Sequence, residues 1–138
     1  MPYLVAYLAV LLVFGVLDLS WLGVMGPRLY RPALSDILLS NLRLAPAIVF
    51  YLGFPIGVVA FAVAPAFRSG TPQAAFVSGL LLGAIAYGTY DLTNFATLRN
   101  WTLQITVVDI VYGALVSAVA AVAAYLLVRA TLGLPAAS

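Results

Sequence analysis

The chain contains no cysteine, histidine, lysine or glutamate, so its ionisable side chains are six arginines, four aspartates and the tyrosines. Haem, zinc, copper and iron–sulfur centres normally need imidazole or thiolate ligands, and nucleophilic triads need a histidine or lysine base. These centres and this kind of catalysis are therefore effectively excluded, and we expect no cofactor. Without cysteine there is also no disulfide.

Charge is scarce as well. Only 7% of the residues are charged and 65% are hydrophobic, against roughly 25% and 45–50% in an ordinary soluble domain. The net charge of +2 is small and the arginines are scattered, which argues against a nucleic-acid partner. Arginine without lysine, together with abundant alanine, glycine and leucine, is typical of a GC-rich bacterial genome. The composition indicates a bacterial integral membrane protein whose partners include membrane lipids.

Four apolar segments are long enough to cross the hydrocarbon core of a bilayer, which takes about 20 residues. The first lacks a basic region ahead of it and a small-residue cleavage site, so we expect a retained helix rather than a signal peptide. The sequence predicts a single all-α domain over residues 1–138, a polytopic membrane protein with four transmembrane helices in an up-down bundle. The predicted spans are residues 3–25, 46–65, 72–98 and 103–128.

Proline and glycine punctuate the second span. Pro65 is expected to end it and Pro55 to kink it. Gly53 and Gly57 form a G-x-x-x-G pattern, which allows a neighbouring helix to approach closely. The glycine- and alanine-rich faces of the second and fourth spans also suggest contacts in a homo-oligomer.

The connection between the first two spans has an amphipathic stretch. Residues 33–43 place Leu34, Ile37, Leu38 and Leu42 on one side and polar residues on the other. This pattern suits a short interfacial helix lying on the bilayer. A loop packed over the bundle fits the stretch equally well, and both interpretations stay open.

The arginines predict the orientation. The connections between spans one and two and between spans three and four lie on the same side of the membrane, and they carry more arginines than the opposite side. Arginine-rich loops are usually cytoplasmic, so we expect a multi-pass protein of the bacterial inner membrane with both termini outside the cytoplasm. The richer side has Arg28, Arg31, Arg43 and Arg99, and the other has Arg68 and Arg129.

Three aspartates lie inside predicted spans. Asp18, Asp91 and Asp109 belong to three different helices, yet the alternating helix directions bring all three to one depth, roughly 10 Å below the arginine-rich surface at 1.5 Å per residue. Each costs about 2.5–3.5 kcal/mol near the middle of a membrane helix. We therefore expect them to face the bundle interior or a water-filled cavity, either paired with hydrogen-bond donors or protonated.

Further polar residues share the faces of these aspartates. In the third span, tyrosine, aspartate and asparagine recur at spacings of three and four residues, which places them on one helix face. Arg99 follows one turn beyond that face and is able to fold back toward the carboxylates. The predicted ligand-binding set is Asp18, Tyr87, Tyr90, Asp91, Asn94, Arg99, Asp109 and Tyr112.

A short repeat links the two halves of the chain. "GVLDLSWLG" in the first span and "GTYDLTNFA" in the third share the pattern G-x-x-D-L-[ST]. The repeat suggests two related helical hairpins about an axis along the membrane normal. A chance match in a sequence of such simple composition is the alternative explanation.

Several motifs resemble one known family. "YGTYDLTNFATLRNW" followed by "VVDIVYG", together with "LDLSWLG", "YRPALSD" and "FYLGFPIGVVAFAVAPA", is similar to the signature of the small bacterial membrane proteins called domain of unknown function 2177. The resemblance implies a four-helix inner-membrane protein without an established biochemical role. It supplies no catalytic residues.

Three functions fit these observations. The first is binding or transport of an ion or an amphiphilic, lipid-like ligand through a cavity lined by aspartate, tyrosine and asparagine. The second is a lipid-headgroup enzyme in which the carboxylates of Asp18, Asp91 and Asp109, with Asn94, hold a divalent cation and the arginines hold phosphate. The closely spaced aspartate motifs of metal-dependent lipid phosphotransferases are absent, so we favour a protein that is not an enzyme and has no metal. The third is a structural or accessory membrane subunit.

Overall fold

The computed structural model describes residues 1–39, 41 and 43–133, and within these ranges the chain is helical except at its connections. Several elements join end to end, so the described residues form four continuous helices long and apolar enough to cross a membrane. The prediction of an all-α protein with four membrane-spanning helices is therefore confirmed. The continuous helices cover Pro2–Leu34, Leu44–Ser69, Pro72–Thr97 and Leu103–Leu132. In chain order the elements are α1 (Pro2–Met25), η1 (Gly26–Tyr30), α2 (Arg31–Leu34), α3 (Leu44–Val58), η2 (Val59–Val63), α4 (Ala64–Ser69), α5 (Pro72–Thr97) and α6 (Leu103–Leu132), where η marks a π-helical turn.

Threonine side chains cap the last two helices. Thr71 precedes α5, and its hydroxyl accepts a hydrogen bond of 3.3 Å from the Ala74 N–H. Thr102 does the same for α6, where the Ile105 N–H donates at 3.0 Å. Such caps satisfy amides that have no partner within the helix and typically stabilise it by about 1 kcal/mol. The Thr102 cap therefore fixes the end of the short α5–α6 connection where α6 begins.

Proline does not end the second membrane helix. Pro65 lies in the first turn of α4, which continues to Ser69, so the prediction that Pro65 ends the span is wrong. The π-helical turn η2 comes directly before it, and there the Ala64 N–H donates to the Val59 carbonyl, five residues back. A proline nitrogen has no hydrogen to donate, and the wider turn lets the helix continue past the missing bond. The helix ends instead at Gly70, whose φ of 75° is left-handed.

Helices α5 and α6 pack closely because glycine removes side chains from their interface. A Cβ atom on Gly83 would lie 2.3 Å from the Gly113 carbonyl oxygen, and one on Gly79 would lie 2.8 Å from Ala118 Cα. Real Cβ atoms do not approach backbone so closely, so only glycine fits at either position. Gly79 and Gly83 form the G-x-x-x-G pattern that brings two helices together in this protein.

The other G-x-x-x-G pattern has no such role within the chain. No heavy atom of a neighbouring element lies within 4 Å of a Cβ built on Gly53 or Gly57. The expectation that this pair receives a neighbouring helix of the same chain is therefore wrong. Spacing of small residues shows which of them share a face, but it does not show which face meets a partner.

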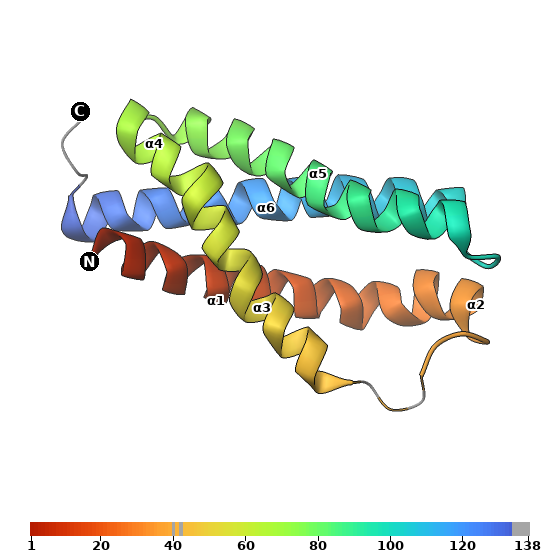
Figure 1. Ribbon diagram of the computed structural model, residues 1–138. Helices are drawn as coiled ribbons and strands as arrows, with labels where there is room; N and C mark the ends of the chain where they lie inside the picture. Colours follow the sequence, from red (N-terminus) through yellow and green to blue (C-terminus); the bar gives the residue numbers. More distant parts are fainter. Residues whose placement is uncertain (40, 42, 134–138) are drawn as a thin grey trace.

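Helix α3 crosses the other helices instead of running along them (Figure 1). It meets α1 where the rings of Phe14 and Phe54 lie 5.1 Å apart. Toward its N-terminal end it leaves the bundle, and residues 44–50 are all exposed. The two hairpins suggested by the sequence repeat therefore pack differently: α5 and α6 run side by side, whereas α3 crosses α1.

The apolar core lies mainly in the half of the molecule that holds the two termini. There α1, α3, η2, α4 and α6 contribute fully buried side chains, among them Val10, Val58, Val63, Tyr125 and Val128. The alanine-rich face of α6 packs into this core. The opposite half has a small satellite cluster around Trp101 and Ile105, and it is the half in which the polar side chains collect.

The described part of residues 33–43 is not a separate helix. Helix α2 ends at Leu34, and the amides of Ile37 and Leu38 turn back to donate to the Leu34 carbonyl. Asp36 then accepts a hydrogen bond from the Asn100 amide, which holds this turn against the connection between α5 and α6. Of the two interpretations left open by the sequence, the described residues fit the loop; positions 40 and 42 lie outside them.

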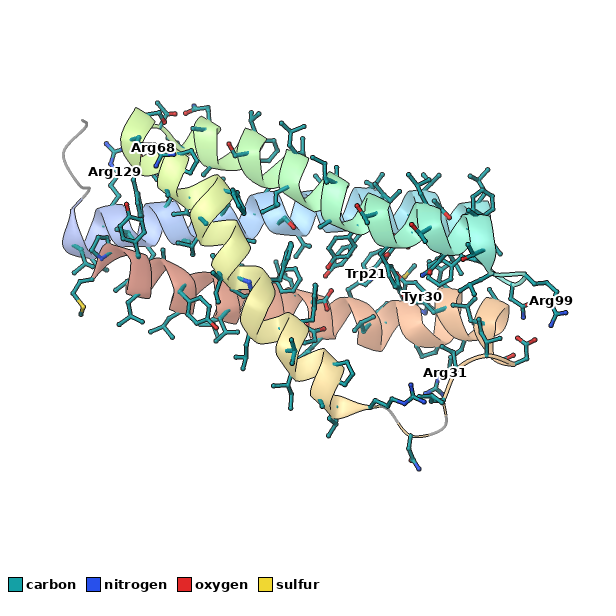
Figure 2. The ribbon with its side chains drawn as sticks, in the orientation of Figure 1. Trp21, Tyr30, Arg31, Arg68, Arg99 and Arg129 are labelled. Atoms are coloured by element: carbon teal, nitrogen blue, oxygen red, sulfur yellow. The ribbon has the colours of Figure 1, made fainter. Side chains whose placement is uncertain are left out.

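The arginines divide between the two ends of the molecule. Figure 2 shows Arg31 and Arg99 at one end and Arg68 and Arg129 at the other. This division agrees with the assignment of the connections to two sides of a membrane.

Candidate functional site

The three aspartates of the spans are all buried. The prediction that all three lie at one depth is wrong for Asp18, because the first membrane helix continues to Leu34 and places Asp18 near its middle. Asp18 on α1 is 6% exposed, Asp91 on α5 is fully buried, and Asp109 on α6 is 8% exposed. Asp91 lies six residues before the end of α5 at Thr97, and Asp109 lies six residues after the start of α6 at Leu103. Because the two helices are antiparallel, both carboxyl groups lie at the same depth, about 9 Å from the helix ends.

Asp18 has a hydrogen-bond donor for each of its carboxylate oxygens. The Tyr112 hydroxyl of α6 donates to Oδ1 at 3.0 Å. The Tyr51 hydroxyl of α3 donates to Oδ2. Asp18 thus joins three helices, and two donors from its own chain compensate its burial. The sequence does not predict this role of Tyr51, because no spacing within α3 indicates that its hydroxyl reaches α1.

Asp109 is held from the end of the first membrane helix. The Tyr30 hydroxyl donates to Asp109 Oδ1, and Trp21 Nε1 donates to the Tyr30 hydroxyl at 3.1 Å. Figure 2 shows Trp21 and Tyr30 pointing from the first helix toward α5 and α6. Trp21 also stacks on Tyr112, with ring centroids 4.1 Å apart and an angle of 5° between the planes. The groups around Asp18 and Asp109 therefore meet at this stack.

A π-helical turn places Tyr30 in this position. Within η1 the Arg31 N–H donates to the Gly26 carbonyl, five residues back. Pro27 lies in this turn and has no N–H to continue the ordinary helix pattern. The shifted register rotates the residues that follow relative to α1, and π-helical turns are frequent at functional sites. The Gly26-Pro27 pair was the only signal of this turn in the sequence.

Asp91 has no donor for either carboxylate oxygen in the described part of the chain. The ionisable side chain that acts on it most strongly is Asp109 on the neighbouring helix. Two ionised carboxylates cannot bond to each other, since neither carries a hydrogen, and like charges repel strongly in a dry interior. Asp91 and Asp109 are therefore an uncompensated pair, unlike Asp18.

The remaining predicted site residues divide into inward and outward groups. Tyr87 is half-buried and packs directly over Gly113, where an added Cβ would lie 2.1 Å from the ring. Tyr90 is 58% exposed and contacts Trp101 edge-on. Asn94 is half-buried on α5. Arg99 is exposed, and Figure 2 shows it pointing outward at the end of the molecule rather than folding back into the bundle.

The hollow beside Trp21 and Tyr112 is an open groove rather than an aspartate-lined cavity. It has a volume of ≈ 410 Å³ and runs between α1 and α6, with Trp21 and Tyr112 among its lining residues. Val24, Leu115 and Val119 make its walls apolar, and no aspartate lines it.

The aspartates do not form a metal-ligand set. Among the residues that the structure describes, no group of three or more histidine, cysteine, aspartate or glutamate side chains is placed to hold a metal ion. Asp18 is occupied by its two tyrosines, and only Asp91 and Asp109 face each other. The arrangement can therefore bind one small positive charge between two carboxyl groups.

Comparison with known proteins identifies the family. The comparison with curated proteins and the comparison with solved structures gave no match. A family model described as "Predicted membrane protein (DUF2177)" matches residues 3–126. The match spans all three buried aspartates and includes every residue of the two hydrogen-bonded groups described above. The chain therefore belongs to the domain of unknown function 2177 family of predicted membrane proteins.

Proposed function

We propose that this protein binds a cation within the membrane and that the site is the carboxyl pair of Asp91 and Asp109. One observation carries the proposal: Asp91 is fully buried, and neither of its oxygens has a hydrogen-bond partner in the described residues. An isolated buried carboxylate is very unfavourable and is compensated by a positive charge or by protonation. A cation between the two carboxyl groups removes the repulsion and satisfies Asp91 at once.

Asp18 differs from Asp91 in having hydrogen-bond donors for both of its carboxylate oxygens. It is similarly buried, but Tyr51 and Tyr112 supply a donor to each of its oxygens. A carboxylate with two such donors needs no further partner. Of the three buried aspartates, we therefore assign the cation to Asp91 and Asp109 and a structural role to Asp18.

The location of the pair supports an ion-related role. Ionisable residues are rare inside membrane helices, and where they occur they commonly mark ion pathways and proton relays. The uneven arginine distribution favours the bacterial inner membrane with both termini outside the cytoplasm. In that orientation the pair lies less than about two helical turns from the cytoplasmic helix ends, at about 9 Å depth, and it would exchange its cation on that side.

Thermal unfolding in mild detergent tests the proposal. The unfolding temperature is measured across a pH series and across Li⁺, Na⁺, K⁺, Mg²⁺ and Ca²⁺ at constant ionic strength. We expect the wild type to respond to at least one of these cations, protons included, and Asp91→Asn to lose that response. Asp36→Asn is the matched control, because Asp36 is exposed and bonded to Asn100. A wild type indifferent to every cation, or an Asp91→Asn variant that responds like the wild type, would overturn the proposal.

The groove between α1 and α6 favours a second function, the binding of a lipid acyl chain. Its walls are apolar, and it lies within the membrane-spanning part of both helices, where lipid is the medium available to fill it. Leu115→Trp fills the groove and is expected to reduce the lipid that co-purifies, measured by native mass spectrometry. Val111→Trp is the control, since Val111 is similarly exposed on α6 but does not line the groove. Equal lipid in both variants would argue against this function.

A further inference from the structure

We infer that the cation is a proton, and that Asp91 and Asp109 share one proton as an acid–carboxylate pair whose carboxylate is oriented by Tyr30. The inference rests on the proposed function, because it names the ligand of the same site. It extends that function by excluding metal ions as the resident ligand and by giving the two aspartates different roles.

The oxygen atoms available at the pair are too few for a metal ion. Hard cations such as Mg²⁺ and Ca²⁺ take about six to eight oxygen ligands, including water. Asp91 and Asp109 offer four carboxylate oxygens, and Asp109 Oδ1 already accepts from Tyr30. No third acidic side chain joins them among the described residues. Asp91 is fully buried, so bulk water does not reach it to complete a coordination shell. A proton needs no more than one donor oxygen and one acceptor oxygen.

The geometry assigns the donor and the acceptor. Tyr30 donates to Asp109 Oδ1, and this bond stabilises Asp109 as the carboxylate. Asp91 has no donor of its own, so nothing stabilises its negative charge. One H⁺ adds to a carboxylate oxygen of Asp91, and the resulting O–H donates a hydrogen bond to a carboxylate oxygen of Asp109. The pair then carries one negative charge, and every carboxyl group at this depth has a hydrogen-bond partner.

The surrounding groups leave the proton as the only nearby compensation. Asp91 faces Asp109 of α6, and the other ionisable groups that act on the pair are Tyr30 of η1, Tyr87 and Tyr90 of α5, and Asp18 of α1. All of them are neutral or negative. The arginines labelled in Figure 2 lie at the two ends of the molecule. No arginine donates a hydrogen bond to Asp91 among the described residues, so two full negative charges on the pair would remain unopposed.

Infrared spectroscopy of the intact protein in detergent tests this inference. A protonated carboxylic acid has a C=O stretching band that is separate from the carboxylate and amide bands and shifts in D₂O. We expect the wild type to show this band at neutral pH. We expect Asp91→Asn to lose it, because Tyr30 still holds Asp109 as a carboxylate. We expect Asp109→Asn to keep it, because Asp91 remains buried without a positive charge beside it. Asn is close in shape to a protonated Asp, so both variants keep a hydrogen-bond donor between α5 and α6.

Two control variants separate this pair from the other aspartates. Asp18→Asn and Asp36→Asn should both retain the band, since neither residue belongs to the pair. If the wild type lacks the band but is stabilised by a metal cation, the inference is overturned and the proposed function stands. If the wild type lacks the band and responds to no cation, both are overturned. A band that survives in Asp91→Asn assigns the proton elsewhere and also overturns the inference.

Discussion

Trp21 and Tyr112 lie flat against each other, with ring centroids 4.1 Å apart, and each ring also serves a different aspartate. Tyr112 donates to Asp18, and Trp21 donates to the Tyr30 hydroxyl that holds Asp109. The indole N–H is a donor only, so the hydrogen bonds do not form a continuous path between Asp18 and Asp109. The stacked rings therefore pack the hydrogen-bonded group around Asp18 against the group around Asp109, and no hydrogen bond connects the two groups.

The first prediction concerns Trp21. Trp21→Phe keeps an aromatic ring against Tyr112 but removes the donor to Tyr30. We expect a loss of about 1 kcal/mol of stability from the hydrogen bond, on top of any loss from the smaller ring. Reversible unfolding in mixed micelles measures it.

Trp101→Phe is the matched control for that prediction. Trp101 is buried, whereas Trp21 is half-buried, and the Trp101 Nε1 has no partner in the described residues. Its replacement removes the same amount of ring without breaking a hydrogen bond, so Trp21→Phe should be the more destabilising of the two. Equal effects would contradict the role given to the Trp21 N–H.

The second prediction concerns the tyrosines that bind Asp18. Tyr51→Phe and Tyr112→Phe each leave one oxygen of a buried carboxylate without a donor. We expect each to destabilise the protein by about 1.5–3 kcal/mol, the range for hydrogen bonds to charged groups. In an Asp18→Asn background the same changes should cost less, because no charge is left unpaired.

Tyr125→Phe tests the same chemistry at a site without a partner. The Tyr125 hydroxyl is fully buried, and no hydrogen bond satisfies it among the described residues. Its removal should leave the stability unchanged or raise it. If Tyr125→Phe proved as harmful as Tyr51→Phe, hydrogen bonding to Asp18 would not explain the effect of the latter.

The third prediction compares the two G-x-x-x-G patterns. Gly83→Ala places a Cβ 2.3 Å from a backbone oxygen of α6, so the helices must separate, and we expect a loss of about 1–3 kcal/mol or more. Gly53→Ala meets no atom within 4 Å and should be neutral or stabilising by up to about 1 kcal/mol through helix propensity. Denaturation in increasing fractions of dodecyl sulfate measures both. A harmful Gly53→Ala would instead indicate that this face contacts a second copy of the chain.

The features that the sequence predicted well are those set by composition and helix geometry. Long apolar runs determine the four membrane helices, and antiparallel helices with a rise of 1.5 Å per residue bring Asp91 and Asp109 to one depth. The hydrogen-bond partners were harder to predict. Tyr30 reaches Asp109 only because η1 shifts the helix register, and Tyr51 reaches Asp18 only because α3 crosses α1.

The packing between helices was the least predictable feature for a related reason. Gly53, Gly57, Gly79 and Gly83 all have the same spacing, and the choice between the two pairs depends on which face of each helix meets a neighbour. In a membrane both the buried and the lipid-facing sides of a helix are apolar, so hydropathy does not distinguish them. The polar residues gave a better indication, since an aspartate is strongly disfavoured on the lipid-facing side.

The most direct test of the central claim counts the protons released on unfolding. If Asp91 and Asp109 share a proton in the folded protein, unfolding at neutral pH in weakly buffered detergent frees both carboxyl groups and releases about one proton per chain. For the same reason, the stability of the wild type should fall as the pH rises, because the folded protein holds more protons than the unfolded chain. The account predicts this release for the wild type and for Asp36→Asn, and none for Asp91→Asn. Unfolding of the wild type without proton release, and without dependence on any metal cation, would contradict it.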